Sequence, residues 1–146
     1  MELALSCDFR IGVDGSRLRV PAAAIGLCYP ISGISRFVQR LGVTTAKRLL
    51  LAAEELSAQQ MLEVGFVDEL VDAVELAQAA DRRASELAAL APLSQRAMKQ
   101  VINSVASGTL DPVEAQRLSR ECLESDDLQE GFAAQRERRA PRFRGC

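Results

Sequence analysis

The sequence begins M-E-L-A-L-S-C-D-F-R-I-G, residues 1–12, and this stretch decides the fold class. It places a carboxylate, Glu2, directly before apolar residues, and residues 8–13 then alternate between polar and apolar side chains. Residues 2–6 are typical of the end of a helix, and the alternation that follows predicts a strand. We therefore expect the chain to start inside packed structure, as the second half of a larger α/β unit.

The composition is that of a globular protein. The chain has 146 residues, of which 48% are hydrophobic and 26% charged, enough for one domain with a sizeable core. Its net charge is -2, whereas dedicated nucleic-acid-binding domains are basic. No apolar run approaches the roughly 20 residues that span a bilayer, and no secretory leader pattern is visible. We expect a cytoplasmic protein without nucleic-acid or membrane partners.

The chain contains no histidine and four widely spaced cysteines. The lack of histidine excludes Ser-His-Asp and Cys-His catalysis and the commonest zinc sites, so no metal site is expected. Without a C-x-x-C pair or an export signal, the cysteines are expected to be free thiols. Any catalysis must then rely on carboxylates, backbone dipoles or a cofactor.

Residues 14–42 combine turn signals with apolar residues. Asp14-Gly15-Ser16 predicts a turn, and Leu18 and Val20 predict a second short extended segment. Residues 22–35 mix glycine and proline with apolar residues, which predicts a buried, irregular loop. Such loops carry function more often than regular elements do.

From residue 43 onward the pattern is helical. Thr44 or Thr45 is expected to cap a first helix, and Ser57 with Gln60 forms a capping box for a short helix that Gly65 ends. Further helices are predicted over residues 75–90, from Pro92 to Gly108, from Pro112 and from Ser125. The expected organisation is residues 1–42 as the end of an α/β core with a pocket loop, followed by a helical region over residues 43–146.

Four ordered motifs resemble those of the enoyl-CoA hydratase/isomerase family, also called the crotonase superfamily. Residues 1–12 are similar to the family's G-G-G-x-E-L-A-L-x-C-D-x-R-I-A, with Glu2 on the glutamate. The block P-E-x-x-L-G-x-x-P-x-x-G-G-x-x-R is matched by Pro21, Ile25, Gly26, Gly33 and Arg36. The block S-A-x-E-A-x-x-x-G-L-V-x-x-V is matched by Ser57, Ala58, Gly65, Val67 and Val71. The closing S-x-D-x-x-E-G-x-x-A-F-x-E-K-R is matched by Ser125, Asp127, Glu130, Gly131, Ala134, Glu137 and Arg139.

The resemblance implies a fold and an assembly. It implies the C-terminal part of the ClpP/crotonase spiral, an α/β fold with a short β start followed by a mainly helical oligomerisation region. It also implies a homotrimer or a hexamer. The motifs cover essentially the whole chain but only the C-terminal half or so of a family member, so we expect a chain that is truncated at its N-terminus.

The resemblance also implies a chemistry. The family acts on acyl-CoA thioesters, in which coenzyme A is part of the substrate and no separate cofactor is needed. Two backbone N–H groups stabilise the thioester enolate in an oxyanion hole, and the family pattern places both before Glu2. Its hydratases add water across the 2,3-double bond with two glutamates, because a buried pair can hold different protonation states.

The family pattern assigns site residues by position. Glu2 takes the first catalytic glutamate, whereas Ala22, which cannot move a proton, takes the second. Pro21, Ala22 and Ile25 are expected to line the substrate site. Arg138 takes the position of a lysine that helps hold the coenzyme A phosphates, and a guanidinium can do the same through its forked donors.

Each of these residues also has a plainer interpretation. From residue type alone, Glu2 is a solvated terminal acid, and Arg138 belongs to a solvated basic tail. Asp8 beside a strand start is more often structural, and Tyr29, the only tyrosine, is more often a packing or hydrogen-bonding residue than an acid. Cys28 has no histidine partner and is expected to be inert.

Two functions remain open. The first is an acyl-CoA hydratase or isomerase of fatty-acid or related metabolism. The alternative is a non-catalytic, truncated or pseudo-enzymatic chain that retains assembly surfaces. Since the oxyanion hole and the second glutamate are both missing, the chain alone is expected to lack hydratase activity. An in-frame G-G-G upstream of Met1 in the gene would favour the enzyme, and a stop codon there would favour the alternative.

Overall fold

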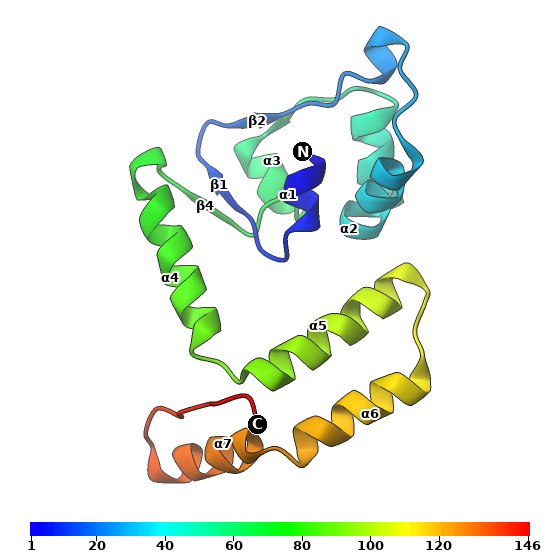
Figure 1. Cartoon of the computed structure of the whole chain (residues 1–146). Helices are drawn as coiled ribbons and strands as arrows, with labels where there is room; N and C mark the ends of the chain where they lie inside the picture. Colours follow the sequence, from blue (N-terminus) through cyan, green and yellow to red (C-terminus); the bar gives the residue numbers. More distant parts are fainter. The chain divides into compact units, whose positions relative to one another are not determined.

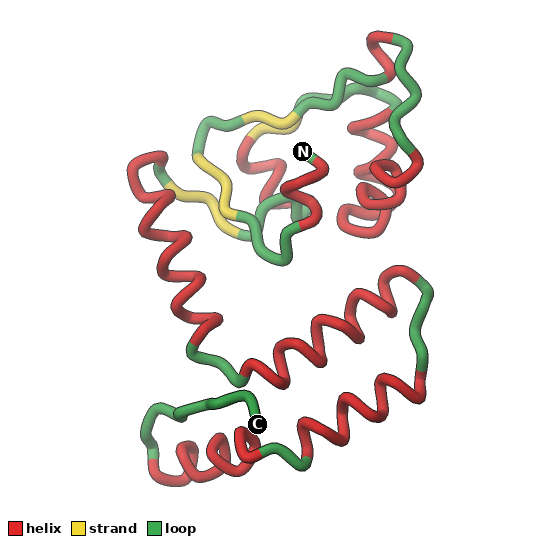
Figure 2. The backbone as a smooth tube through the Cα atoms, viewed as in Figure 1, coloured by secondary structure: helices red, strands yellow, loops and turns green.

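The computed structural model describes all 146 residues, which form two compact units, Met1–Asp81 and Arg82–Cys146. The order of elements is visible in Figures 1 and 2. The elements are α1 (Glu2–Ser6), β1 (Ile11–Val13), β2 (Arg17–Leu18), η1 (Ala23–Ile25), α2 (Ile31–Leu50), β3 (Leu56–Ser57), α3 (Ala58–Glu63), β4 (Glu69–Val71), η2 (Ala73–Glu75), α4 (Leu76–Ala88), α5 (Pro92–Ser107), α6 (Pro112–Leu123) and α7 (Asp126–Glu137). None of the helices is both long and apolar enough to cross a membrane.

Two short strand pairs join the start of the first unit to its end. β1 runs parallel to β4, with Ile11 opposite Glu69, and β2 runs antiparallel to β3. The first compact unit thus extends to Asp81, beyond the expected α/β region of residues 1–42. The reason is the parallel pairing, which holds residues 69–71 against residues 11–13, a long-range contact that composition does not indicate.

Arg10 fixes the junction between these paired segments. Its backbone N–H donates to Asp68 Oδ2 at 2.6 Å, and its guanidinium lies 3.7 Å from the other carboxylate oxygen. Its Nε donates to the carbonyl of Phe66 at 2.6 Å. Because the Arg10 side chain is only 11% exposed, these partners satisfy a charge that burial would otherwise disfavour.

The core of the first unit lies where α1, α2 and the short strands meet. Its largest fully buried side chains are Phe37, Leu5, Leu49, Leu56 and Val20. Leu5 comes from α1 and Phe37 from α2, so the predicted helix over residues 2–6 is confirmed as a packed element. Truncating a buried phenylalanine typically removes about 3–5 kcal/mol of stability.

The prediction for residues 22–35 was wrong in two respects. Only Ala22 and Gly33 in this range are buried, and α2 begins at Ile31. The helix expected to start at Thr44 or Thr45 is the second part of α2, which continues across a kink at Gly42. Gly42 has φ 77° and ψ 164°, values that glycine adopts without a steric penalty.

Most helix ends behave as the sequence predicts. Ser57 and Gln60 form the reciprocal capping box of α3. Pro92 opens α5 and Gly108 ends it in the left-handed conformation. The Ser125 side chain caps α7 by accepting a hydrogen bond from Leu128 N–H.

The second unit has little core of its own. α5 packs on α6 and α6 on α7, but the buried apolar residues are only Ala97, Leu118 and Ala134. Many large apolar side chains of this unit are exposed instead: Leu90, Met98, Ile102, Val105, Leu110, Val113, Leu123 and Phe132. A domain of this size needs more buried apolar surface than this to be stable alone.

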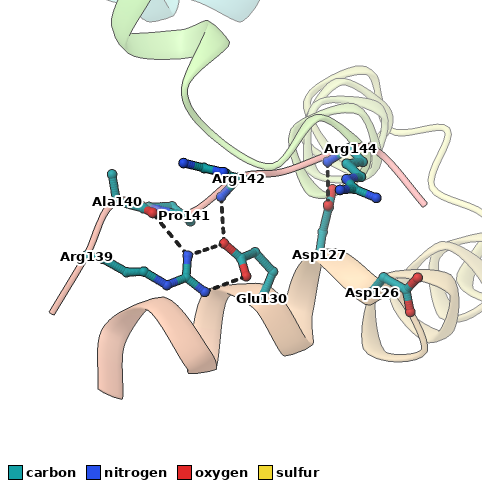
Figure 3. Close-up of a pocket in the computed structure, with 8 residues that line it drawn as sticks. All are labelled: Asp126, Asp127, Glu130, Arg139, Ala140, Pro141, Arg142 and Arg144. Carbon is teal, nitrogen blue, oxygen red and sulfur yellow. Dashed lines mark hydrogen bonds and ion pairs between the residues drawn. The ribbon is translucent and has the colours of Figure 1, made fainter. Parts of the chain in front are cut away.

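Two carboxylates of α7 hold the C-terminal tail (Figure 3). Asp127, 3% exposed, accepts hydrogen bonds from the backbone N–H groups of Arg144 at 2.6 Å and Gly145 at 2.8 Å. Glu130 accepts two from the Arg139 guanidinium, at 2.6 and 2.8 Å, and one from Arg142 N–H at 2.7 Å. The acids of the closing family motif therefore dock the tail onto α7.

This docking gives the stability of the chain a defined pH dependence. The Arg139 guanidinium and the Arg142 N–H hold the pKa of Glu130 at about 2, and unfolding returns it to about 4.3. The ionised carboxylate therefore stabilises the folded chain fully above roughly pH 4.5, and this contribution is lost as the pH falls through about 2. We expect the urea midpoint of the parent to decline over this window more steeply than that of Glu130→Gln.

The matched control is Glu124→Gln, because Glu124 is an exposed acid at the end of α6. Its midpoint should follow the parent at every pH, as measured by circular dichroism. Equal slopes for Glu130→Gln and the parent would show that Glu130 does not hold the tail.

Candidate active site

The candidate site is built around Glu2, the first residue of α1. α1 packs against α2, and Leu5, one turn after Glu2, is fully buried in the core. Because Leu5 is fixed in the core, the first residue of α1 lies next to the first turns of α2. Glu2 consequently lies beside Arg36, Gly33 and Tyr29.

The two carboxylate oxygens of Glu2 have different environments. Oε2 lies 3.6 Å from Nη1 of Arg36, an ion pair whose two side chains are each about a third exposed. Oε1 is buried and has no hydrogen-bond partner within the chain. Buried polar atoms are nearly always hydrogen-bonded, so an unpartnered one calls for an explanation. Arg36 thus orients the carboxylate, while Oε1 is left free to accept a proton or a hydrogen bond.

Gly33 makes room for this arrangement. A Cβ atom at Gly33 would lie 1.9 Å from Glu2 Oε1 and 2.4 Å from Cε1 of the Tyr29 ring. Real Cβ atoms do not approach other atoms so closely. The missing side chain at Gly33 is therefore what allows the carboxylate and the ring edge to lie next to each other.

Tyr29 is held in place by its ring. It makes an edge-to-face contact with buried Phe37, with ring centroids 5.8 Å apart. Burial, then the negative charge of Glu2, raises the pKa of Tyr29, and the positive charge of Arg36 lowers it by less. The phenol therefore remains protonated at neutral pH and can act as a hydrogen-bond or proton donor.

The other expected substrate-binding residues of the first unit belong to a turn. The Pro21 and Ala22 carbonyls accept hydrogen bonds from Ile25 N–H, and Ala22 also accepts from Leu27 N–H at 2.9 Å. Ala22 itself is 4% exposed and packs in the core, whereas Ile25 is 71% exposed. The position that the family resemblance assigns to the second glutamate is thus occupied by a packed methyl group.

Arg138 lies in the second unit, at the end of α7. It is exposed and adopts a left-handed conformation, φ 53° and ψ 41°, at the C-cap. It does not line the pocket of about 890 Å³ beside it, which lies between α7 and the tail (Figure 3). That pocket contains Asp127, Glu130 and Arg139, whose charges are already paired with the tail or with each other.

The structure adds residues to which sequence reasoning gave no role in the site: Gly33 and Arg36 were only motif matches, and Phe37 was not singled out. Gly33, Arg36 and Phe37 are three and four positions apart, the spacing that puts residues on one face of a helix. The sequence contains this helical spacing, but it was not recognised because residues 22–35 were expected to form an irregular loop. No group of three or more Cys, Asp or Glu side chains is placed to hold a metal ion, and all four cysteines are free.

Comparisons with known proteins show the family of the chain. The sequence model of the enoyl-CoA hydratase/isomerase family matches residues 1–146. The (E)-benzylidenesuccinyl-CoA hydratase of Thauera aromatica is 32% identical, over 100% of this chain and 58% of that protein. The short-chain-enoyl-CoA hydratase of Clostridium acetobutylicum is 29% identical, over 94% of this chain and 54% of that protein.

Solved structures show the same relationship. An enoyl-CoA hydratase/carnithine racemase from Magnetospirillum magneticum superposes with a TM-score of 0.88 and 26% identity, over 99% of this chain and 54% of that chain. DspI of Pseudomonas aeruginosa superposes with a TM-score of 0.83 and 33% identity, over 98% of this chain and 55% of that chain.

These matches define the class of protein as the crotonase superfamily, of whose fold this mainly helical chain forms the C-terminal part. The chain belongs to its enoyl-CoA hydratase/isomerase family. It spans between 54% and 58% of the length of the two curated relatives described above.

Gly33 provides a direct test of the Glu2 cluster. In Gly33→Ala the new methyl must displace the Glu2 carboxylate and press on the Tyr29 ring, which Phe37 holds. Overpacking of this kind costs about 1–3 kcal/mol, which exceeds the gain of up to about 1 kcal/mol from replacing glycine by alanine in a helix. We expect a net loss of stability in urea denaturation.

The neighbouring variant Ser32→Ala is the control, since Ser32 is exposed on the same turn of α2. It should change stability by less than about 0.5 kcal/mol. A Gly33→Ala protein as stable as the parent would mean that a methyl group fits between Glu2 and Tyr29, and that these side chains do not pack as closely as described.

Proposed function

We propose that the chain supplies the glutamate-bearing part of an enzyme that hydrates the 2,3-double bond of acyl-CoA thioesters. The observation that supports this best is the Glu2 carboxylate, with Oε2 held by Arg36 and Oε1 unpartnered beside the space at Gly33. Two relatives that align over nearly the whole chain are named hydratases of CoA thioesters. Coenzyme A enters as part of the substrate, and no other cofactor is required.

In this proposal Glu2 acts as the general base. Oε1 accepts a proton from a water molecule as the water oxygen bonds to the β-carbon, and the double-bond electrons move toward the thioester carbonyl. Arg36 keeps the carboxylate oriented, and backbone N–H donors outside residues 1–146 stabilise the enolate oxygen. The exposed guanidinium of Arg138 is available to bind the coenzyme A phosphates.

The buried methyl of Ala22 favours a second candidate, a chain that assembles without catalysing hydration. Without a carboxylate at this position, the chain cannot use the two-glutamate hydration mechanism that the family resemblance implies. The exposed apolar faces of α5 to α7 would then be the functional part, as assembly surfaces. The two candidates differ in whether Glu2 matters for turnover.

An assembly is part of both candidates. The second unit leaves large apolar side chains of α5, α6 and α7 exposed to water, and exposed apolar patches are typical of protein–protein contact surfaces. We propose that they are buried between copies of the chain, in a homotrimer or a pair of trimers. This burial would supply the apolar core that Ala97, Leu118 and Ala134 alone do not provide.

Glu2→Gln separates the candidates. The test protein, called the joined protein here, carries the N-terminal part of the Clostridium acetobutylicum relative fused before residue 1. General acid–base catalysis contributes roughly 100- to 10,000-fold, so Glu2→Gln should lower kcat by about that factor and leave KM nearly unchanged. The assay is hydration of crotonyl-CoA and longer enoyl-CoA thioesters.

Two comparisons complete this test. Glu124→Gln in the joined protein should keep parental activity, and the 146-residue chain alone should be inactive. If Glu2→Gln is as active as an active parent, Glu2 is a structural acid and the site assignment is wrong.

Light scattering tests the assembly. The 146-residue chain should show a mass above that of a monomer that rises with concentration. Ile102→Lys, which places a charge at an exposed apolar position of α5, should lower that mass, whereas Asn103→Lys at the next, exposed position should not. A monomer at all concentrations would contradict the proposed assembly.

A further inference from the structure

The hydration scheme needs a source for the proton that ends on the α-carbon. In the two-glutamate scheme the second carboxylate shares this work, but Ala22 replaces it and its methyl group is buried. The Cys28 thiol donates to the backbone carbonyl of Tyr29 and not to Glu2, and the Arg36 guanidinium is paired with Glu2 and is no acid at neutral pH. The side chain that remains beside the Glu2 carboxylate is Tyr29, whose ring edge lies next to it at Gly33 and whose phenol feels its charge.

We propose that the Tyr29 hydroxyl is the second proton-transfer group of this site and takes the place of the absent glutamate. The inference rests on the proposed hydratase function. Its basis is the juxtaposition at Gly33, where Glu2 Oε1 and the Tyr29 ring edge both lie within 2.4 Å of the position that a side chain would occupy.

The step balances without a further reactant. A water O–H proton passes to Glu2, the water oxygen bonds to the β-carbon, and the double-bond electrons form the thioester enolate. Tyr29 then gives its O–H proton to the α-carbon as the enolate collapses, which leaves a phenolate. The protonated Glu2 returns its proton to that phenolate, so the net change is the addition of one water molecule.

The surroundings of Tyr29 suit this role. The ring is oriented by its edge-to-face contact with Phe37, which is fully buried. Burial and then the charge of Glu2 raise the pKa of the phenol, and the charge of Arg36, which lowers it, favours a transient phenolate. A residue that only fills space would need neither of these charges.

The first test uses the 146-residue chain as it is. Tyr29 is its only tyrosine and it has no tryptophan, so ultraviolet absorbance reports the ionisation of this one phenol. Glu2→Gln should lower the pKa of Tyr29, and Arg36→Met should raise it. A pKa that neither variant moves would overturn the inference, because the phenol would then not face the Glu2 carboxylate.

The second test uses the joined protein. Tyr29→Phe keeps the ring and its contact with Phe37, and should lower kcat for hydration roughly 100-fold or more with little change in KM. Difluorotyrosine at position 29, whose phenol is more acidic, should move the alkaline limb of the kcat profile to lower pH. Ser32→Ala should match the parent.

The outcomes separate the two proposals. If the parent is active and Tyr29→Phe equals it, the role of Tyr29 is overturned while the hydratase function stands. If a folded parent hydrates no thioester, the hydratase function has failed and the proton transfer by Tyr29 fails with it. An active parent, an impaired Tyr29→Phe and a shifted profile with difluorotyrosine together support the inference.

Discussion

The packing of α1 against α2 is the contact on which the candidate site depends. Leu5 and Phe37 are both fully buried where these helices meet, and each supports one side of the site. Leu5 anchors the helix that begins with Glu2, and Phe37 orients the ring of Tyr29. Close packing leaves little free volume, so the absence of a side chain at Gly33 is what lets the Glu2 carboxylate and the Tyr29 ring edge lie side by side.

Three carboxylates of the family motifs differ in the hydrogen-bond partners that the folded chain supplies to them. Asp127 and Glu130 accept hydrogen bonds from backbone N–H groups of the tail, and Glu130 also accepts from Arg139, so both carboxylates already have partners within the chain. Glu2 has one oxygen paired with Arg36 and one without a partner. All three carry the same charge, so the hydrogen-bond donors around each acid, and not its charge, distinguish the one that keeps an unpartnered oxygen.

Local patterns predicted the regular elements well, because their signals lie within a few residues. The capping box at Ser57 and Gln60, the proline start of α5 and the Ser125 cap all depend on hydrogen bonds between close neighbours in the chain. The loop over residues 22–35 was predicted poorly, because its glycine and proline content indicated irregular structure and did not show that a helix begins at Ile31. Local patterns also did not indicate how far the first compact unit extends, since the pairing of β1 with β4 is a contact of high sequence separation.

The sequence by itself determined the family, the position of Glu2 as the candidate acid and the loss of a second carboxylate at Ala22, since these depend on residue identity and order. Only the tertiary structure decided which groups surround Glu2. Arg36, Gly33 and Tyr29 are 27 or more positions away along the chain, and they reach Glu2 because two buried side chains bring α1 and α2 together. An unpartnered oxygen is a property of that packing, because whether a donor lies within hydrogen-bonding distance depends on the folded positions of residues that local sequence patterns do not relate.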